Sequence, residues 1–320
     1  MNKIPLLAFI AMSIKISIEL VEKGIELMFS GSLVAVVTPM KSDGKIDYKG
    51  WEKLIYWHLA SDTDGLVILG STGEAPTITF KERTKMIRQV VDQVNEEIPV
   101  IVGTGSNSTS YTIELTQHAM ESGADAALIV TPYYNKPTQE GLFQHFQAIA
   151  GAVPVPQILY NVPSRTACDL LPETILQLAE CCTNIIGIKE ATGDIGRVRQ
   201  LLQQGNRLDL FSGDDNTAMD FMLAGGKGVI SVIANILPKK FHALCGAAIS
   251  GKMDLAKKYN DELSPLYKLL FVESNPIPIK WALSQMGMIP EGIRLPLTPF
   301  NEKYHNEMRE AMHRVGIKNL

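Results

Sequence analysis

The chain has 320 residues, of which 46% are hydrophobic, 20% charged and 7% aromatic. This composition excludes a disordered or fibrous protein, because it supplies enough apolar material for a large core. The net charge of −4 and the lack of any dense Lys/Arg run argue against an electrostatic nucleic-acid binder.

The first 27 residues differ in texture from the rest of the chain. Lys3 precedes an apolar run at residues 4–14, which is shorter than the ~20-residue helix needed to span a bilayer. The run resembles a signal-peptide core, but no A-x-A-like cleavage site follows it. Met28 stands directly before the first strand-like run. We expect residues 1–27 to be an extension from an upstream start, or a dispensable arm, rather than an export signal.

Short apolar, β-branched runs recur from Met28 onward, and each is continuous in hydrophobicity rather than alternating. Parallel strands that are buried on both faces have this pattern. The runs lie at residues 33–38, 65–70, 100–104, 126–132, 157–162, 185–189, 208–212 and 228–234. Segments of helical period separate them, as at residues 80–94, where Thr79 and Glu82 fit a capping box.

Eight strand–helix repeats predict an α/β fold of the (β/α)8 TIM-barrel type, whose usual size of ~250 residues fits a unit ending near Gly251. A doubly wound open sheet is the alternative, but residues 38–40 lack its usual Gly-rich dinucleotide fingerprint. Three further helices are expected at residues 255–270, 277–286 and 301–315. We therefore expect an N-terminal extension at 1–27, a barrel at 28–251 and a C-terminal helical domain at 252–320.

The cysteines and histidines give no signal for a disulfide or a metal site. The four cysteines form no C-x-x-C pair, and the six histidines show no H-x-x-x-H or H-x-H spacing. We expect a reduced, cytoplasmic protein without a metal ion.

The active sites of such barrels lie at the C-terminal ends of the strands, so reactive residues at those ends are candidates. The sixth expected strand ends in Lys189, and period-2 geometry puts Ile185, Gly187 and Lys189 on one face. A desolvated amine that points inward there suits Schiff-base formation with a carbonyl substrate. The alternative is a lysine that extends to water at a strand end.

Two more candidates follow the fifth expected strand. Tyr160 ends that strand at the level of Lys189 and could transfer protons, although a strand tyrosine is often only core filler. Arg165 offers an always-charged fork for a substrate carboxylate, or is simply a surface arginine in a loop.

Two polar turns complete the set of candidates. Ser71 and Thr72, in a glycine-flanked turn after the second strand, could bind an anion. Ser71 and Glu74 also fit a capping box, so the same turn could start a helix. Asp214 and Asp215 follow the seventh strand, where a helix N-cap is expected because no third ligand accompanies them for a metal.

Taken together, several segments resemble the dihydrodipicolinate synthase family in their order and strand placement. They are G-S-T-G-E at 70–74, P-Y-Y-N at 132–135, Y-N-V-P-S-R-T at 160–166 and G-I-K-E-A at 187–191. The segments S-G-D-D at 212–215, G-V-I-S-V at 228–232 and N-P-I-P-I-K at 275–280 extend the resemblance, which runs from about residue 28 to residue 317.

The resemblance implies a lyase of the class I aldolase type. Pyruvate forms an imine with Lys189, and the derived enamine attacks L-aspartate 4-semialdehyde in the committed step toward diaminopimelate and lysine. By resemblance Tyr160 donates and accepts protons, and Thr72 and Tyr134 complete the proton relay, with Tyr134 reaching into the neighbouring subunit's site. The family also implies a homotetramer built from tight dimers and a reaction without a metal or organic cofactor. From the charge and the short apolar run we expect no nucleic-acid or membrane partner.

The resemblance assigns the substrate contacts as well. Ser71 and Thr72 hold the pyruvate carboxylate, Arg165 receives the carboxylate of the semialdehyde, and Gly213 and Ile230 line the pocket. The family often has Thr-Thr where this chain has Ser71 and Thr72, and serine keeps the hydroxyl.

Two other functions remain open alternatives. A pyruvate-dependent sugar-acid aldolase such as N-acetylneuraminate lyase shares the imine and often has Ser-Thr in the turn, but such relatives generally lack Arg165 and the K-E-A run at 189–191. A catalytically silent binding barrel is the alternative from another class, and the intact Lys189, Tyr160, Thr72 and Tyr134 argue against it.

The effector pocket known from lysine-inhibited relatives is altered in this chain. Those relatives use histidines and a glutamate after strands two and three, where this chain has Phe80, Arg83 and Tyr111, although Asn107 and Tyr133 remain. Without the carboxylate, an ammonium-bearing effector loses its charge partner. We expect weak or absent inhibition by lysine.

Overall fold

A computed structural model describes residues 29–203 and 208–318. The extension expected at residues 1–27 lies outside the described residues. Within the described ranges, every helix is too short or too polar to serve as a membrane span.

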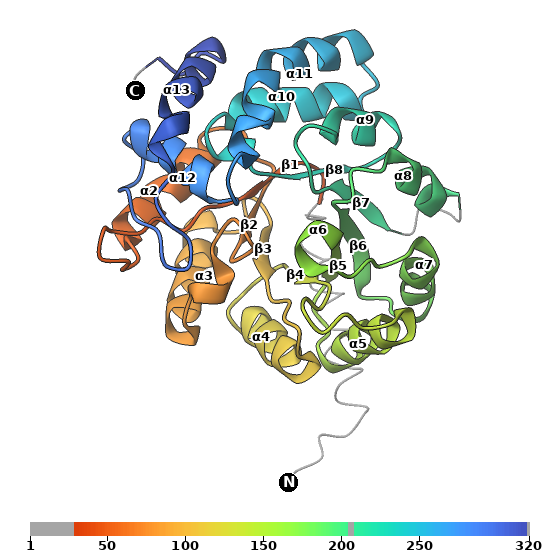
Figure 1. Cartoon of the computed structure of the whole chain (residues 1–320). Helices are drawn as coiled ribbons and strands as arrows, with labels where there is room; N and C mark the ends of the chain where they lie inside the picture. The colour runs from red at the N-terminus through yellow and green to blue at the C-terminus, as the bar shows by residue number, and fades with distance from the viewer. Residues whose placement is uncertain (1–28, 204–207, 319–320) are drawn as a thin grey trace.

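Eight parallel strands close into a barrel in which each strand pairs with its neighbours in chain order and β8 pairs with β1 (Figure 1). This confirms the (β/α)8 prediction. The strands are β1 (Gly31–Ala35), β2 (Gly65–Ile68), β3 (Val100–Gly103), β4 (Ala126–Val130), β5 (Gln157–Asn161), β6 (Ile185–Glu190), β7 (Asp209–Ser212) and β8 (Gly228–Ser231). Several expected runs extend past the paired residues because buried apolar side chains continue into the following loops, as at Val36 and Val37.

Helices surround the barrel and connect successive strands (Figure 1). They are α2 (Tyr48–Leu59), α3 (Phe80–Val94), α4 (Thr109–Glu121), α5 (Gln139–Ala152), α6 (Pro163–Thr166), α7 (Pro172–Cys181), α8 (Ile195–Leu202), α9 (Ala218–Leu223) and α10 (Pro238–Ile249), with 3-10 turns η1 (Ala75–Thr77) and η2 (Ile233–Asn235). The capping box at the start of α3 is confirmed, since the Thr79 side chain accepts from the Glu82 amide and the Glu82 carboxylate accepts from the Thr79 amide.

The apolar side chains form one cluster inside the barrel and others between the strands and the helices. The inner cluster includes Leu33, Val67, Ile158, Phe211 and Ile230, which come from five different strands. Because the inner and outer faces of the strands are both apolar, the strands show the continuous hydrophobic runs seen in the sequence.

The expected C-terminal helices are present as α11 (Met253–Tyr267), α12 (Ile277–Gln285) and α13 (His305–Arg314), with 3-10 turns η3 (Leu269–Phe271) and η4 (Glu302–Tyr304). They lie together on one side of the barrel (Figure 1) and share a hydrophobic cluster with α2, α3 and α10. The connection between η3 and α12, residues 272–276, passes over the C-terminal ends of the strands, where residues 272–275 line a cavity.

Candidate active site

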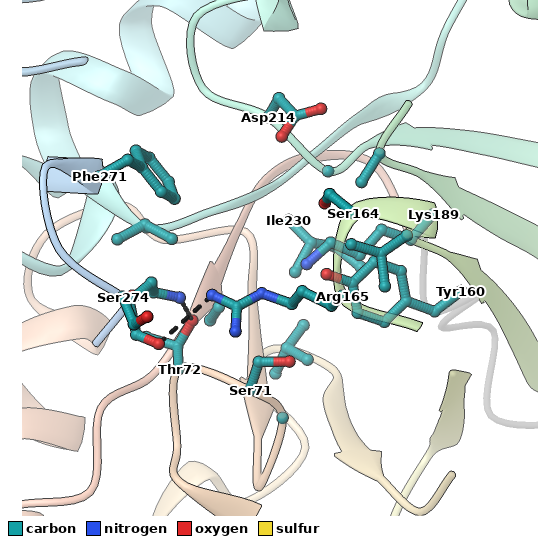
Figure 2. Close-up of a pocket in the computed structure, with 18 of the residues that line it drawn as sticks. Ser71, Thr72, Tyr160, Ser164, Arg165, Lys189, Asp214, Ile230, Phe271 and Ser274 are labelled. Atoms are coloured by element: carbon teal, nitrogen blue, oxygen red, sulfur yellow. Dashed lines mark hydrogen bonds between the residues drawn. The ribbon is translucent and has the colours of Figure 1, made fainter. Parts of the chain in front are cut away.

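A cavity of about 710 Å³ opens at the C-terminal ends of the barrel strands. Its walls come from the strand ends of the barrel on one side and from residues 271–275 on the other (Figure 2). Seven predicted site residues line this cavity: Ser71, Thr72, Tyr160, Arg165, Lys189, Gly213 and Ile230.

Lys189 and Tyr160 are direct neighbours on adjacent strands. Tyr160 of β5 pairs with Lys189 of β6 in the strand register, and the Lys189 Nζ lies 4.4 Å from the centroid of the Tyr160 ring. Each residue is only 7% exposed, and both side chains line the cavity (Figure 2). The expectation that Lys189 points into the barrel mouth is therefore confirmed.

The expectation that Ile185 shares the face of Lys189 is wrong. The register between β5 and β6 shifts at the start of β6, where Gln157 pairs with Ile185 but Ile158 pairs with Gly187. Ile185 consequently packs in the outer cluster, whereas Ile186 packs against the inner one. An extra residue of this kind reverses the alternation of side chains along a strand.

Burial changes the acidity of both central groups. It lowers the pKa of the Lys189 amine from 10.5 to about 8, while Asp214 and Asp215 act in the opposite direction and Arg165 adds to the lowering. Burial also raises the pKa of the Tyr160 phenol to about 12. At pH 7 about one Lys189 amine in ten is therefore neutral and nucleophilic, and the phenol keeps its proton.

The turn after β2 brings two hydroxyl groups to the cavity. Thr72 is 3% exposed, and Ser71 is partly exposed beside it. The backbone of the turn is held from the loop after β1, because the Thr38 hydroxyl donates to the Gly73 carbonyl oxygen at 2.7 Å. The turn thus presents fixed donors to a ligand in the cavity.

The capping box expected for Ser71 and Glu74 is wrong. Glu74 has a φ of 57°, its side chain makes no cap, and only the short turn η1 follows it. Its carboxylate instead forms a buried ion pair with Lys280 of α12 and accepts from the Arg294 backbone amide at 3.3 Å. A tertiary ion pair therefore overrides the local pattern.

Arg165 lies in α6, the short helix after β5, and its side chain extends across the cavity toward Thr72 and Ser274 (Figure 2). Its Nη2 donates to the Asn275 carbonyl oxygen at 3.4 Å. In the part of the chain that the structure describes, Arg165 has no ion pair with a carboxylate. Its positive charge is available to an anionic group of a substrate.

The helix N-cap expected for Asp214 and Asp215 is wrong: Asp214 lines the cavity, and Asp215 caps a different structure. The following helix, α9, begins after Thr217 without a side-chain cap. Asp215 instead accepts from the backbone amides of Val232 and Ile233 at 3.1 and 2.8 Å, at the start of η2. Among the described residues, no group of His, Cys, Asp and Glu side chains could hold a metal ion.

Tyr134 is the one predicted site residue outside the cavity. It lies in the loop after β4, and its side chain is 88% exposed. Its φ of 75° is in the left-handed region, which is unusual for a bulky residue. Tyr133 beside it is 38% exposed, so the loop presents two aromatic side chains on the surface of the chain.

A second cavity of about 510 Å³ adjoins the first and shares Ser71, Tyr160 and Arg165 with it. Arg83 and Tyr111, two of the residues that we expect to alter the effector pocket, line this cavity. Arg83 is 6% exposed, and its Nη1 donates to the Gly103 carbonyl oxygen at 2.9 Å. The wall of this cavity thus carries a buried cation.

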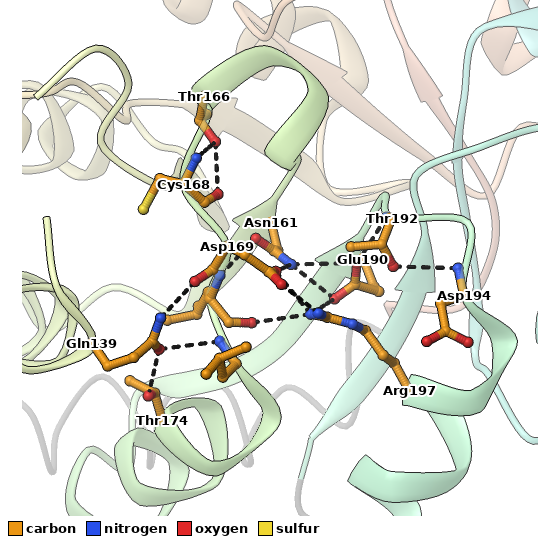
Figure 3. Close-up of polar contacts among 12 residues, drawn as sticks. Gln139, Asn161, Thr166, Cys168, Asp169, Thr174, Glu190, Thr192, Asp194 and Arg197 are labelled. Carbon is orange, nitrogen blue, oxygen red and sulfur yellow. Dashed lines mark hydrogen bonds and ion pairs between the residues drawn. The ribbon is translucent and has the colours of Figure 1, made fainter. Parts of the chain in front are cut away.

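Sequence reasoning missed a polar network on the outer face of β5 and β6 (Figure 3). Asn161 pairs with Glu190 one residue beyond the Tyr160–Lys189 pair, and its Nδ2 donates to Glu190 Oε2 at 3.2 Å and to Asp169 Oδ1 at 2.8 Å. Arg197 of α8 forms ion pairs with Asp169 at 2.5 Å and Glu190 at 3.5 Å. These bonds fix the strand register directly behind the reactive pair.

Asn275 was missed as well, although it lies in a segment that carries part of the family resemblance. Its Nδ2 donates to the Thr72 Oγ1 at 2.9 Å. An asparagine before a proline gives no periodic or motif signal for such a contact, because the two residues are 203 positions apart.

Comparison with known proteins agrees with this geometry. The model of the dihydrodipicolinate synthetase family matches residues 28–315. A 4-hydroxy-tetrahydrodipicolinate synthase of Coxiella burnetii is 71% identical over 291 residues, which cover 91% of this chain and 100% of the relative, and one of Nitrosococcus oceani is 56% identical over 91% of this chain and 99% of its own length.

A solved structure is also similar. The chloride-inhibited dihydrodipicolinate synthase of Acinetobacter baumannii, in complex with pyruvate, is 51% identical, with a TM-score of 0.89 over 91% of this chain and 100% of that one. Both the family match and these identities extend over nearly the whole described chain. The chain therefore belongs to the dihydrodipicolinate synthetase family.

Proposed function

We propose that the chain condenses pyruvate with L-aspartate 4-semialdehyde through an imine on Lys189 and forms 4-hydroxy-tetrahydrodipicolinate for diaminopimelate and lysine synthesis. The observation that carries this proposal is a buried amine with a pKa of about 8, in a cavity that Tyr160 and Arg165 also line. Membership of the family supports the choice of both substrates.

In the proposed reaction, the neutral Lys189 amine attacks the carbonyl carbon of pyruvate. Tyr160 donates a proton to the departing hydroxyl, so that the carbinolamine loses water and becomes an imine. The Tyr160 phenolate then accepts a methyl proton and converts the imine to an enamine, whose terminal carbon attacks the aldehyde carbon of the semialdehyde. Tyr160 returns this proton to the aldehyde oxygen, which becomes a hydroxyl. The amino group of the new product then displaces Lys189 from the imine carbon, which closes the ring and frees the enzyme.

The other cavity residues have binding roles in this proposal. Ser71 binds the pyruvate carboxylate through its hydroxyl and Thr72 binds it through its backbone N–H, which leaves the Thr72 hydroxyl for the proton relay. Arg165 binds the carboxylate of the semialdehyde. Gly213 and Ile230 form part of the cavity wall. A Cβ at Gly213 would lie 2.4 Å from the Ala191 Cβ, so a larger residue at position 213 would displace the chain at the end of β6. Arg165 has no carboxylate partner among the described residues, and its guanidinium makes only the bond from Nη2 to the Asn275 carbonyl oxygen, which supports this role.

We also infer that Tyr134 completes the proton relay with Thr72 and Tyr160 in the site of a neighbouring subunit, within a homotetramer of dimers. Two observations support this inference. The exposure of 88% leaves Tyr134 accessible to a neighbouring subunit. Its left-handed backbone conformation costs roughly 1–3 kcal/mol of conformational free energy, and such strain persists where surrounding structure fixes it. We further propose that residues 28–251 form the barrel domain and residues 252–320 a helical domain, and that the protein is cytoplasmic. The four free cysteines support the reducing compartment.

A coupled assay tests the proposal. In the first assay, the purified chain receives pyruvate and aspartate semialdehyde, and the oxidation of NADPH by added dihydrodipicolinate reductase is followed. In a parallel assay, the chain receives N-acetylneuraminate and its cleavage is followed. We expect turnover in the first assay and its loss in Lys189→Ala. Turnover only with N-acetylneuraminate would identify a sugar-acid aldolase, and turnover with neither, together with no imine, would identify a silent binding barrel.

A further inference from the structure

The segment N-P-I-P-I-K at residues 275–280 contacts the active-site turn at two points, and the reaction described above uses neither. At its first residue, the Asn275 Nδ2 donates to the Thr72 Oγ1 at 2.9 Å. At its last residue, Lys280 forms the ion pair with Glu74. A segment from beyond the barrel thus contacts the middle and the end of a turn that carries hydroxyl groups into the cavity.

The two contacts have different consequences. The Glu74 and Lys280 side chains are 1% and 5% exposed, and together with the bond from Thr38 to the Gly73 carbonyl they hold the backbone of the turn. The amide of Asn275 contacts only the side chain of Thr72 and no backbone atom of the turn. Removing that amide therefore leaves the turn supported and changes the environment of one hydroxyl.

The chemistry of the contact fixes the direction of that hydroxyl. A threonine hydroxyl has one proton to donate, and an amide N–H can only donate. Because Thr72 accepts from Asn275, its own proton points away from Asn275. Within the described part of the chain the Thr72 hydroxyl has no other hydrogen-bond partner, and Thr72 lines the cavity with Tyr160 and Lys189.

We propose that Asn275 is a positioning residue that directs the hydroxyl proton of Thr72 into the cavity and so sets the direction of the proton relay through Thr72 and Tyr160. The inference rests on the relay proposed above. Asn275 acts through Thr72. Its backbone carbonyl also accepts from Arg165 at 3.4 Å, so Asn275 contacts both the relay residue Thr72 and Arg165, the residue proposed to bind the semialdehyde carboxylate.

The test measures exchange of the pyruvate methyl protons for deuterium in D2O by proton NMR. This exchange needs only the Lys189 imine and proton transfer, so it can succeed or fail independently of turnover with the semialdehyde. Asn275→Ala should slow exchange at saturating pyruvate about ten-fold, the effect expected for one misdirected hydrogen bond, while borohydride still traps the imine.

A double-mutant cycle separates positioning from a general structural effect. In a Thr72→Val background, which has no hydroxyl to direct, Asn275→Ala should change the exchange rate less than about two-fold. Asn184→Ala is the matched control. Asn184 lies in the connection before β6, and its Nδ2 also donates to carbonyl oxygens, those of Ala150 and Val153. It should leave the exchange rate unchanged.

Asn275→Asp supplies a variant of nearly the same shape if Asn275→Ala does not fold. Its carboxylate accepts where the amide donated, so Thr72 must donate back to it, and exchange should be at least as slow as in Asn275→Ala. Three results would overturn the inference: normal exchange in Asn275→Ala, an equal loss in both Thr72 backgrounds, or restoration of the normal rate by aspartate.

Discussion

The pH dependence of imine formation follows directly from the buried position of Lys189. With a pKa of about 8, the neutral fraction of the amine is about 9% at pH 7, about 50% at pH 8 and about 91% at pH 9. The rate of imine formation with pyruvate should therefore rise about ten-fold between pH 7 and pH 9 and then level off. An amine at its ordinary pKa of 10.5 would instead gain about ten-fold for every pH unit up to pH 10.

The assay mixes enzyme with pyruvate at each pH, stops the reaction with borohydride after set times and measures the reduced adduct by intact-protein mass spectrometry. Asp214→Asn removes a negative charge that raises the pKa of Lys189, so its profile should shift to lower pH. The control Asp209→Asn lies at the other end of β7 and should leave the profile in place. A rate that climbs ten-fold per pH unit through pH 10, or a shift of Asp214→Asn to higher pH, would refute the reasoning.

Three further predictions concern the substrate fork, the buried ion pair and the effector cavity. Arg165→Ala should raise the KM for the semialdehyde about ten- to hundred-fold in the coupled assay while the pyruvate imine still forms, and an unchanged KM would remove its assigned role. Lys280→Met leaves the buried Glu74 carboxylate without its charge partner and should lower the free energy of unfolding, measured in urea, by about 3–5 kcal/mol. Adding Glu74→Gln should restore part of that stability, and a loss below about 1 kcal/mol in Lys280→Met would contradict the importance of the pair. Lysine should inhibit weakly or not at all because Arg83 lines the cavity in place of an anionic partner, and half-inhibition well below millimolar lysine would overturn this expectation.

The fold could be predicted from the sequence because its signals are local. A strand that is buried on both faces needs a continuous apolar run, and a helix on its surface needs an apolar stripe, so the eight repeats are visible without any knowledge of contacts. The same locality placed Lys189 and Tyr160 at adjacent strand ends. Their position in one cavity then follows from barrel closure.

The parts of the site that were missed depend on pairing between distant segments. The extra residue at Ile186 depends on how β6 aligns with β5, which no property of β6 alone specifies. Glu74 satisfies a local capping pattern, but Lys280, 206 positions away, provides a stronger partner. Asn275 likewise reaches Thr72 only because the connection between η3 and α12 passes over the C-terminal ends of the strands.

The central claim is that Lys189 is the amine that captures pyruvate. The most direct measurement is to reduce the chain with borohydride in the presence of pyruvate, digest it and locate the modified lysine by peptide mass spectrometry. The account predicts one reduced pyruvate adduct on Lys189, formed in the native chain and absent from Lys189→Ala. An adduct on another lysine, or capture that persists in Lys189→Ala, would contradict it.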